Sequence, residues 1–162
     1  MIEIEHEDAI ISAFILFIQT AQAVLKSADA YLYRKAKLSV IKLIVLQSLE
    51  KNNGVMTPSD IAEWTQTERH NITALVQRMK RDGLVTSERS SKDKRIVHVI
   101  LTDRGREVLE QTMPAAREMK DLIMSSITED EATQMADKLR ILRQNAFNAL
   151  GQMSFHIKKW PA

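Results

Sequence analysis

The sequence predicts a mainly α-helical protein with one small β-hairpin in the middle of the chain. Two observations support this fold class. Apolar residues recur every three or four positions along most of the chain, which is the period of a helix with one buried face. Residues 84–101 instead show two short strand-like runs joined by a polar stretch. The length of 162 residues fits one domain, or one domain with an oligomerisation extension.

The N-terminal third is predicted to form two helices. Residues 8–35 lack Gly and Pro and carry an apolar stripe, and residues 38–51 repeat the pattern before Asn52, Asn53 and Gly54 end the second helix. Residues 9–18 (AIISAFILFI) follow acidic residues, unlike a signal peptide. That run is also shorter than the ~20 residues of a membrane span. We expect a buried helix in a cytoplasmic protein without membrane contact.

A helix-turn-helix is expected next. Thr57 is a good N-cap, Pro58 suits a first helical position, and Asp60 favours the positive end of the helix. This short helix reaches about Trp64. After a tight break, a second helix covers residues 67–82, is closed by Gly83 and has a core stripe at Ile72, Leu75, Val76 and Met79.

Two strands at residues 84–89 and 96–101 are predicted to form a hairpin whose polar tip is residues 90–95. Thr102 caps a long helix that reaches about Ile127. The T-x-x-E capping box that begins at Thr128 then starts a last helix, which reaches about Leu150. Residues 151–162 are expected to form a loose tail. This order predicts a winged helix-turn-helix lobe at residues 38–106, flanked by a helical dimerisation region at residues 1–37 and 107–162.

The outer helices carry wider apolar faces than so small a core needs. Packing within one chain accounts for one such face. Two of them favour a homodimer, for which the candidate interface residues are Ile11, Phe14, Ile18, Leu139, Leu142, Ala146 and Leu150.

Charge is segregated along the chain. The whole chain has a net charge of +2, whereas residues 69–95 carry +5 and residues 1–33 carry −4. Such segregation favours a polyanion-facing middle, although a solvated basic surface gives the same pattern.

The polar side of helix 67–82 is a candidate DNA-reading surface. Side chains near the N-terminus of such a helix reach base edges in a major groove. The candidate base-reading residues are Arg69, His70, Asn71, Thr73 and Ala74, and the candidate backbone contacts are Thr67, Gln77, Arg78 and Arg81. Asn and Arg can pair bidentately with adenine and guanine. An ordinary exposed helix face remains the alternative.

The hairpin tip is a candidate wing that contacts DNA through Ser91, Lys92, Lys94 and Arg95. Asp93 lies among these cations, where a carboxylate facing a phosphate would be repelled. We expect Asp93 to pair with Arg95 and brace the wing, at a gain in stability of only ~0–1 kcal/mol.

Other chemistry finds little support. The absence of Cys excludes disulfides, cysteine nucleophiles and thiolate zinc sites. The histidines at positions 6, 70, 98 and 156 form no ligand pattern, so no metal is expected. Catalytic constellations and phosphate-binding glycine loops are missing as well, so we expect neither an enzyme nor a cofactor.

The stretch Ser59–Leu109 resembles the winged helix-turn-helix core of MarR-type bacterial transcription regulators. Four motifs carry the resemblance, in order: Ser59–Glu63, Asn71–Met79, Asp82–Val85, and Asp93–Arg95 with Leu101–Arg106. The resemblance implies a homodimer on a pseudo-palindromic operator, often a repressor relieved by a small ligand. Thr65 and Thr67 replace the usual apolar turn residues. Ala74 stands where a basic residue is frequent, which leaves base preference open.

We therefore expect a sequence-specific regulator of double-stranded DNA, a homodimeric repressor released by a small ligand or another signal. A ligand pocket between the long helices and the lobe would be lined by Tyr31, Tyr33, Leu46 and Trp64, for each of which plain packing is the alternative. Two other functions stay open: a protein–protein module that uses the same basic face on an acidic partner, and a ligand sensor without DNA binding.

Overall fold

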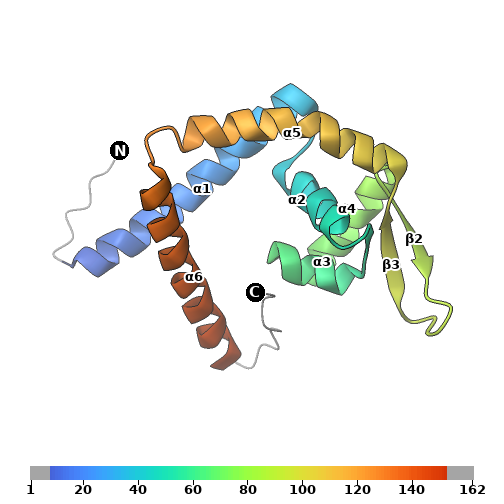
Figure 1. Cartoon of the computed structure of the whole chain (residues 1–162). Helices are drawn as coiled ribbons and strands as arrows, with labels where there is room; N and C mark the ends of the chain where they lie inside the picture. Colours follow the sequence, from blue (N-terminus) through green and yellow to red (C-terminus); the bar gives the residue numbers. More distant parts are fainter. Residues whose placement is uncertain (1–7, 153–162) are drawn as a thin grey trace.

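The computed structural model describes residues 8–152 and confirms the mainly helical fold class with a small sheet. The helices are α1 (Ala9–Ala36), α2 (Val40–Lys51), α3 (Pro58–Thr65), α4 (Arg69–Arg81), α5 (Asp103–Ile123) and α6 (Glu129–Gln152). The strands are β1 (Val55–Met56), β2 (Val85–Arg89) and β3 (Val97–Leu101). α2 to α4 and the sheet form a lobe at one end, from which the β2–β3 hairpin projects (Figure 1).

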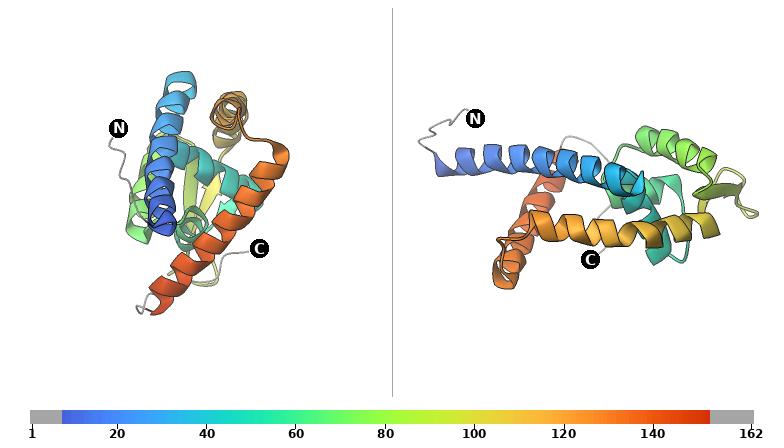
Figure 2. Two further views of the ribbon diagram at one scale, coloured as in Figure 1. Left: turned by 90° about the vertical axis from the view of Figure 1, so that its left-hand side faces the viewer. Right: turned by 90° about the horizontal axis from the view of Figure 1, so that it is seen from above.

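α1 and α5 lie side by side and lead away from the lobe, and α6 turns back from the far end of α5 (Figure 2). α5 ends at Ile123, four residues before the predicted Ile127, because the chain turns at residues 124–126. α6 includes residues 151 and 152, so the predicted tail does not begin at residue 151. The rest of that tail lies outside the described residues.

The sheet is antiparallel, with strand order β1-β3-β2. β2 and β3 pair from Val85 opposite Leu101 to Arg89 opposite Val97, as the predicted hairpin requires. Strand β1 was not predicted, because two residues are too short to show an alternating pattern. It adds to the sheet where Gly54, at φ +80°, accepts a 2.8 Å hydrogen bond from the Leu101 amide.

Local capping signals formed as predicted. Thr57 Oγ1 accepts from the Asp60 amide at 3.2 Å, and Asp60 Oδ2 accepts from the Thr57 amide at 3.2 Å. Thr102 Oγ1 accepts from the Gly105 amide at 3.0 Å and also donates to the Gly83 carbonyl at 2.7 Å. Gly105 is needed here, since a Cβ at this position would lie 2.2 Å from the Leu84 carbonyl oxygen. The start of α5 is thereby fastened to the lobe.

The main core lies inside the lobe. Leu46, Leu49, Ile61 and Ile72 are fully buried there, and α1 contributes little more than Leu32. The prediction of a buried helix over residues 9–18 is wrong for the single chain. Ile10 is 80%, Phe14 60% and Leu16 63% exposed, because no other part of the described chain covers this half of α1.

Helix α1 is also long and apolar enough to cross a membrane, by length and composition alone, with a mean hydropathy of 1.7 over its most apolar 18 residues. A helix whose apolar face is covered by another protein chain satisfies the same two criteria.

Candidate nucleic-acid interface

Helix α4 turns one face to the core and the other to solvent. Ile72, Leu75, Val76 and Met79 are buried. All five predicted base-reading residues are exposed on the other side, together with Gln77, Arg78 and Arg81. Thr67 precedes the helix and is half-buried in the turn, where its amide donates to the Ala62 carbonyl at 3.0 Å. The turn residue Gln66 has φ +53°, which lets α4 leave α3 at a sharp angle.

Two polar contacts fasten the C-terminal end of α4. Lys42 Nζ on α2 lies 2.7 Å from Asp82 Oδ2. Lys80 Nζ donates to Ser87 Oγ on β2 at 2.7 Å. Sequence reasoning missed both contacts, since their partners are not adjacent along the chain. They set the orientation of the exposed face of α4 relative to the hairpin.

The hairpin tip is ordered by its own polar groups. Asp93 Oδ1 accepts from the Arg95 amide at 2.9 Å and from Arg95 Nε at 3.3 Å. Ser90 donates its amide to the Ile96 carbonyl at 2.9 Å, which closes the tip. Ser91, Lys92, Lys94 and Arg95 are all exposed, the Arg95 side chain to 92%. The expected Asp93–Arg95 contact is therefore present, and its effect on DNA binding stays a prediction.

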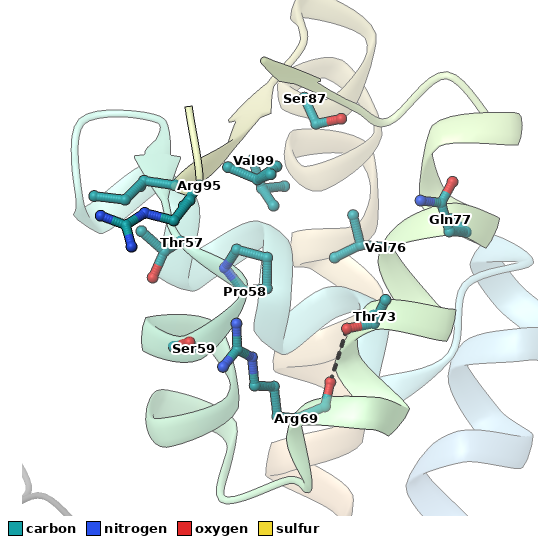
Figure 3. A pocket seen from close by; sticks show the side chains of 12 residues that line it. Thr57, Pro58, Ser59, Arg69, Thr73, Val76, Gln77, Ser87, Arg95 and Val99 are labelled. Atoms are coloured by element: carbon teal, nitrogen blue, oxygen red, sulfur yellow. Dashed lines mark hydrogen bonds between the residues drawn. The ribbon is translucent and has the colours of Figure 1, made fainter. Parts of the chain in front are cut away.

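A groove of about 450 Å³ separates α4 from the hairpin and the start of α3 (Figure 3). Arg69, Thr73, Val76 and Gln77 line it from α4, Arg95 from the wing, and Val99 from β3. The groove thus brings together residues predicted for bases, backbone and wing. It also includes residues that sequence reasoning had not assigned to a site: Thr57, Pro58, Ser59, Ser87, Ile96 and Val97. The capping signal at Thr57 marked the first of these, but only as a helix start.

The residues predicted to line a ligand pocket take different environments. Leu46 is fully buried in the core, and Trp64 is half-buried against it. Tyr33 is 61% exposed, so it does not face the interior. For Leu46, packing is the role that the structure supports.

Tyr31 lies at the junction of α1 and α5. Its hydroxyl oxygen is buried beside the Glu118 carboxylate, although no hydrogen bond of good geometry forms. The carboxylate raises the pKa of Tyr31, and burial raises it further. The hydroxyl in turn lowers the pKa of Glu118, helped by Lys35, whose Nζ lies 3.6 Å from Glu118 Oε1. This cluster joins the outer helices to each other.

The predicted dimer residues are exposed in the single chain. Ile11 is 48%, Phe14 60% and Leu142 45% exposed, and Ile18, Leu139 and Ala146 are open as well. The side chain of Leu150 lies outside the described part of the chain. A mostly apolar concavity of about 880 Å³ separates the first half of α1 from α6, and Phe14, Phe17, Leu139 and Phe147 line it.

The two histidines in the described part of the chain lie on different elements. His70 is exposed on α4, and His98 is half-buried on β3 opposite Glu88. His6 and His156 lie outside the described residues. Across residues 8–152, no group of three His, Asp or Glu side chains has the geometry to hold a metal ion.

Comparison with known proteins places the chain in a family. Residues 37–96 match the model of the MarR family. The HTH-type transcriptional repressor IacR of Pseudomonas putida is 30% identical over 114 residues, covering 70% of this chain and 68% of IacR.

Two solved structures share the fold. Sco3205, a MarR family transcriptional regulator from Streptomyces coelicolor crystallised in complex with DNA, has a TM-score of 0.80 at 23% identity, covering 88% of this chain and 91% of Sco3205. The organohalide-sensing regulator RdhR-CbdbA1625, in its ligand-free form, has a TM-score of 0.81 at 21% identity, covering 100% of this chain and 95% of RdhR-CbdbA1625. The family model, the IacR match and the shared winged helix-turn-helix show that this chain belongs to the MarR family of transcriptional regulators.

Proposed function

We propose that the protein is a homodimeric repressor in which α4 enters the major groove of operator DNA and the wing at residues 90–95 contacts the adjacent minor groove. The observation that carries this proposal is the groove in Figure 3, where the polar face of α4 and Arg95 of the wing border one surface. Support comes also from IacR, which is named a repressor, and from Sco3205, which was crystallised with DNA.

The residues divide by position. Arg69, His70 and Asn71 lie in the first turn of α4, where side chains reach base edges, and Thr73 and Ala74 follow in the next turn. Arg78 and Arg81 lie further along and suit phosphates, as do Thr67 and Gln77 at the margins. Lys92, Lys94 and Arg95 contact the minor groove or its backbone, while Asp93 holds Arg95 in place.

Dimerisation explains the open apolar faces of α1 and α6. A second copy would cover Phe14, Leu139 and their neighbours, which a single chain leaves in water. The dimer would place its two α4 helices about one DNA turn apart, roughly 34 Å, and so match a pseudo-palindromic operator. Residues 1–37 and 107–162 then serve dimerisation, and residues 38–106 bind DNA in the cytoplasm.

Release from DNA needs a second state of the dimer. A small ligand or another signal that binds better to a dimer with the wrong spacing of α4 helices would shift the population toward that state. RdhR-CbdbA1625 is described as organohalide-sensing, which supports a ligand as the signal.

A competition gel shift tests the proposal. The full chain is mixed with labelled fragments of its own upstream region and with random competitor DNA, at several salt concentrations. We expect one fragment to be retained, with affinity that falls steeply with salt because phosphate contacts release counterions. His70→Ala and Asn71→Ala should alter the preferred sequence, whereas Arg81→Ala should weaken binding to all fragments. Failure to prefer any fragment at moderate salt would overturn the proposal and favour an acidic protein as the partner of this face.

A further inference from the structure

The middle of the DNA-facing side of α4 is small and rich in methyl groups. Thr73 and Ala74 are both exposed, while Ile72 and Leu75 on either side of them are buried. Ala74 offers DNA a single methyl group and no polar atom. Between residues 69 and 77 the chain has one arginine or lysine, Arg69. Apart from Arg69, this part of α4 therefore lacks the arginine and lysine donors that usually read guanine.

The hydroxyl group of Thr73 is already engaged within the helix. Thr73 Oγ1 donates to the carbonyl oxygen of Arg69 at 3.0 Å, as the dashed line in Figure 3 shows. A hydroxyl has one hydrogen to donate, so Thr73 can offer a base only an acceptor oxygen and its γ-methyl group. It cannot donate to the O6 or N7 acceptors of guanine while this bond persists.

Arg69 does not compensate for this. Its side chain extends along the groove toward Pro58 and Ser59 at the start of α3, rather than along the exposed face of α4 (Figure 3). The bases that approach the middle of α4 thus meet Thr73 and Ala74.

Only the A·T base pair matches both the exposed methyl groups and the acceptor oxygen of Thr73. In the major groove the single apolar group is the C5 methyl of thymine, and its partner adenine presents an N6 amino donor. A guanine–cytosine pair has an amino donor but no methyl group. We propose that Thr73 and Ala74 read A·T base pairs, through packing of their methyl groups on the C5 methyls of thymine. This inference rests on the proposed entry of α4 into the major groove.

The test uses the full chain and two steps. Selection from a random double-stranded library first defines the half-site. Each thymine of that half-site is then replaced by deoxyuridine, which removes the C5 methyl and keeps the base pairing. We expect one or two replacements to weaken binding about fourfold each, since burial of one such group is worth roughly 0.8 kcal/mol and tenfold corresponds to about 1.4 kcal/mol.

A matched pair of variants assigns the effect to a residue. Thr73→Ser removes the γ-methyl and keeps the hydroxyl, so it should bind the thymine and deoxyuridine sites equally at one position. Thr73→Val removes the hydroxyl and keeps the shape with its methyl groups, so it should still distinguish the two sites at that position. Ala74→Gly should abolish the distinction at a neighbouring pair. Circular dichroism of each variant verifies that α4 is intact, since Gly lowers helix propensity.

The outcomes distinguish failure of the methyl readout from failure of the proposed repressor function. Selective binding without any sensitivity to deoxyuridine would overturn the methyl readout and leave the repressor proposal standing. So would a sensitivity that Thr73→Ser and Ala74→Gly both leave unchanged. If the library yields no preferred site at all, both proposals fall.

Discussion

The lobe and the outer helices use similar apolar stripes with opposite results. In the lobe, Leu46, Leu49 and Ile61 are completely buried by neighbouring elements of the same chain. In the outer region, Phe14 on α1 and Leu142 on α6 remain 60% and 45% exposed. A stripe thus indicates that a helix face needs a cover, but not whether the cover belongs to the same chain. Here the cover is internal in the lobe and, in our proposal, external for the outer helices.

Leu46→Ala tests most sharply whether the lobe core is packed by elements of the same chain. Leu46 is fully buried, so its truncation should lower the free energy of unfolding by about 2–5 kcal/mol through lost burial and a residual cavity. Urea denaturation followed by circular dichroism measures this change. Leu142→Ala is the matched control in the outer region. At protein concentrations below dimer formation it should cost far less, because no part of the chain that the structure describes packs fully around Leu142.

Leu46 was expected to line a ligand pocket, and this variant also addresses that expectation. Unchanged stability in Leu46→Ala would contradict the packing role and support the pocket assignment.

Phe14→Asp tests whether a second copy of the chain covers α1. A carboxylate buried against the apolar surface of that copy would have no hydrogen bond or opposite charge to stabilise it. The dissociation constant of the dimer should therefore rise at least about tenfold. Sedimentation velocity over a range of concentrations gives this constant. Val55→Asp places the same charge on an apolar lobe residue that is 42% exposed, and it should leave the dimer intact. A wild-type chain that stays monomeric at all concentrations would contradict the proposed dimer.

The sequence predicted local structure well and contacts between distant segments poorly. Local signals were reliable: the caps at Thr57 and Thr102 and the hairpin tip around Asp93 all formed as expected. Contacts between distant segments were missed, such as Lys42 with Asp82, because no short-range pattern encodes them. α2 shows why the sequence left two roles open for Leu46, packing or lining a pocket. That helix is surrounded by other elements, so its buried residues extend beyond the single stripe that periodicity identifies.

Within the lobe, the wing should affect DNA binding without affecting stability. Arg95→Ala should weaken binding to operator and random DNA together, by about tenfold. It should also reduce the slope of log affinity against log salt concentration by about one, as expected for the loss of one phosphate contact. Thermal unfolding should barely change, because an exposed pair such as Asp93–Arg95 is worth only ~0–1 kcal/mol. Arg117→Ala on α5 removes another exposed arginine, which lies outside the groove, and should leave DNA affinity intact. Unfolding at a much lower temperature in Arg95→Ala would identify Arg95 as structural.

The smallest expected effect concerns the start of α6, where order depends on a cap rather than on a core. Glu131 accepts from the Thr128 amide at 2.9 Å and from Thr128 Oγ1 at 2.8 Å, and these bonds lower the pKa of Glu131 below its ordinary value of 4.5. Since the folded chain favours the charged form, the stabilisation is complete above pH 4.5 and disappears as the pH falls through the lowered pKa.

Carbon-detected NMR of the Glu131 carboxyl group measures this pKa directly. Thr128→Ala removes one of the two donors, so the pKa of Glu131 should move back toward its ordinary value. The control is Thr133→Ala, because Thr133 Oγ1 donates to the Glu129 carbonyl and leaves Glu131 untouched. An unchanged pKa in Thr128→Ala would leave only the Thr128 amide as its cause. A pKa at its ordinary value in the wild type would mean that this cap does not form, and that α6 starts only where a partner chain holds it.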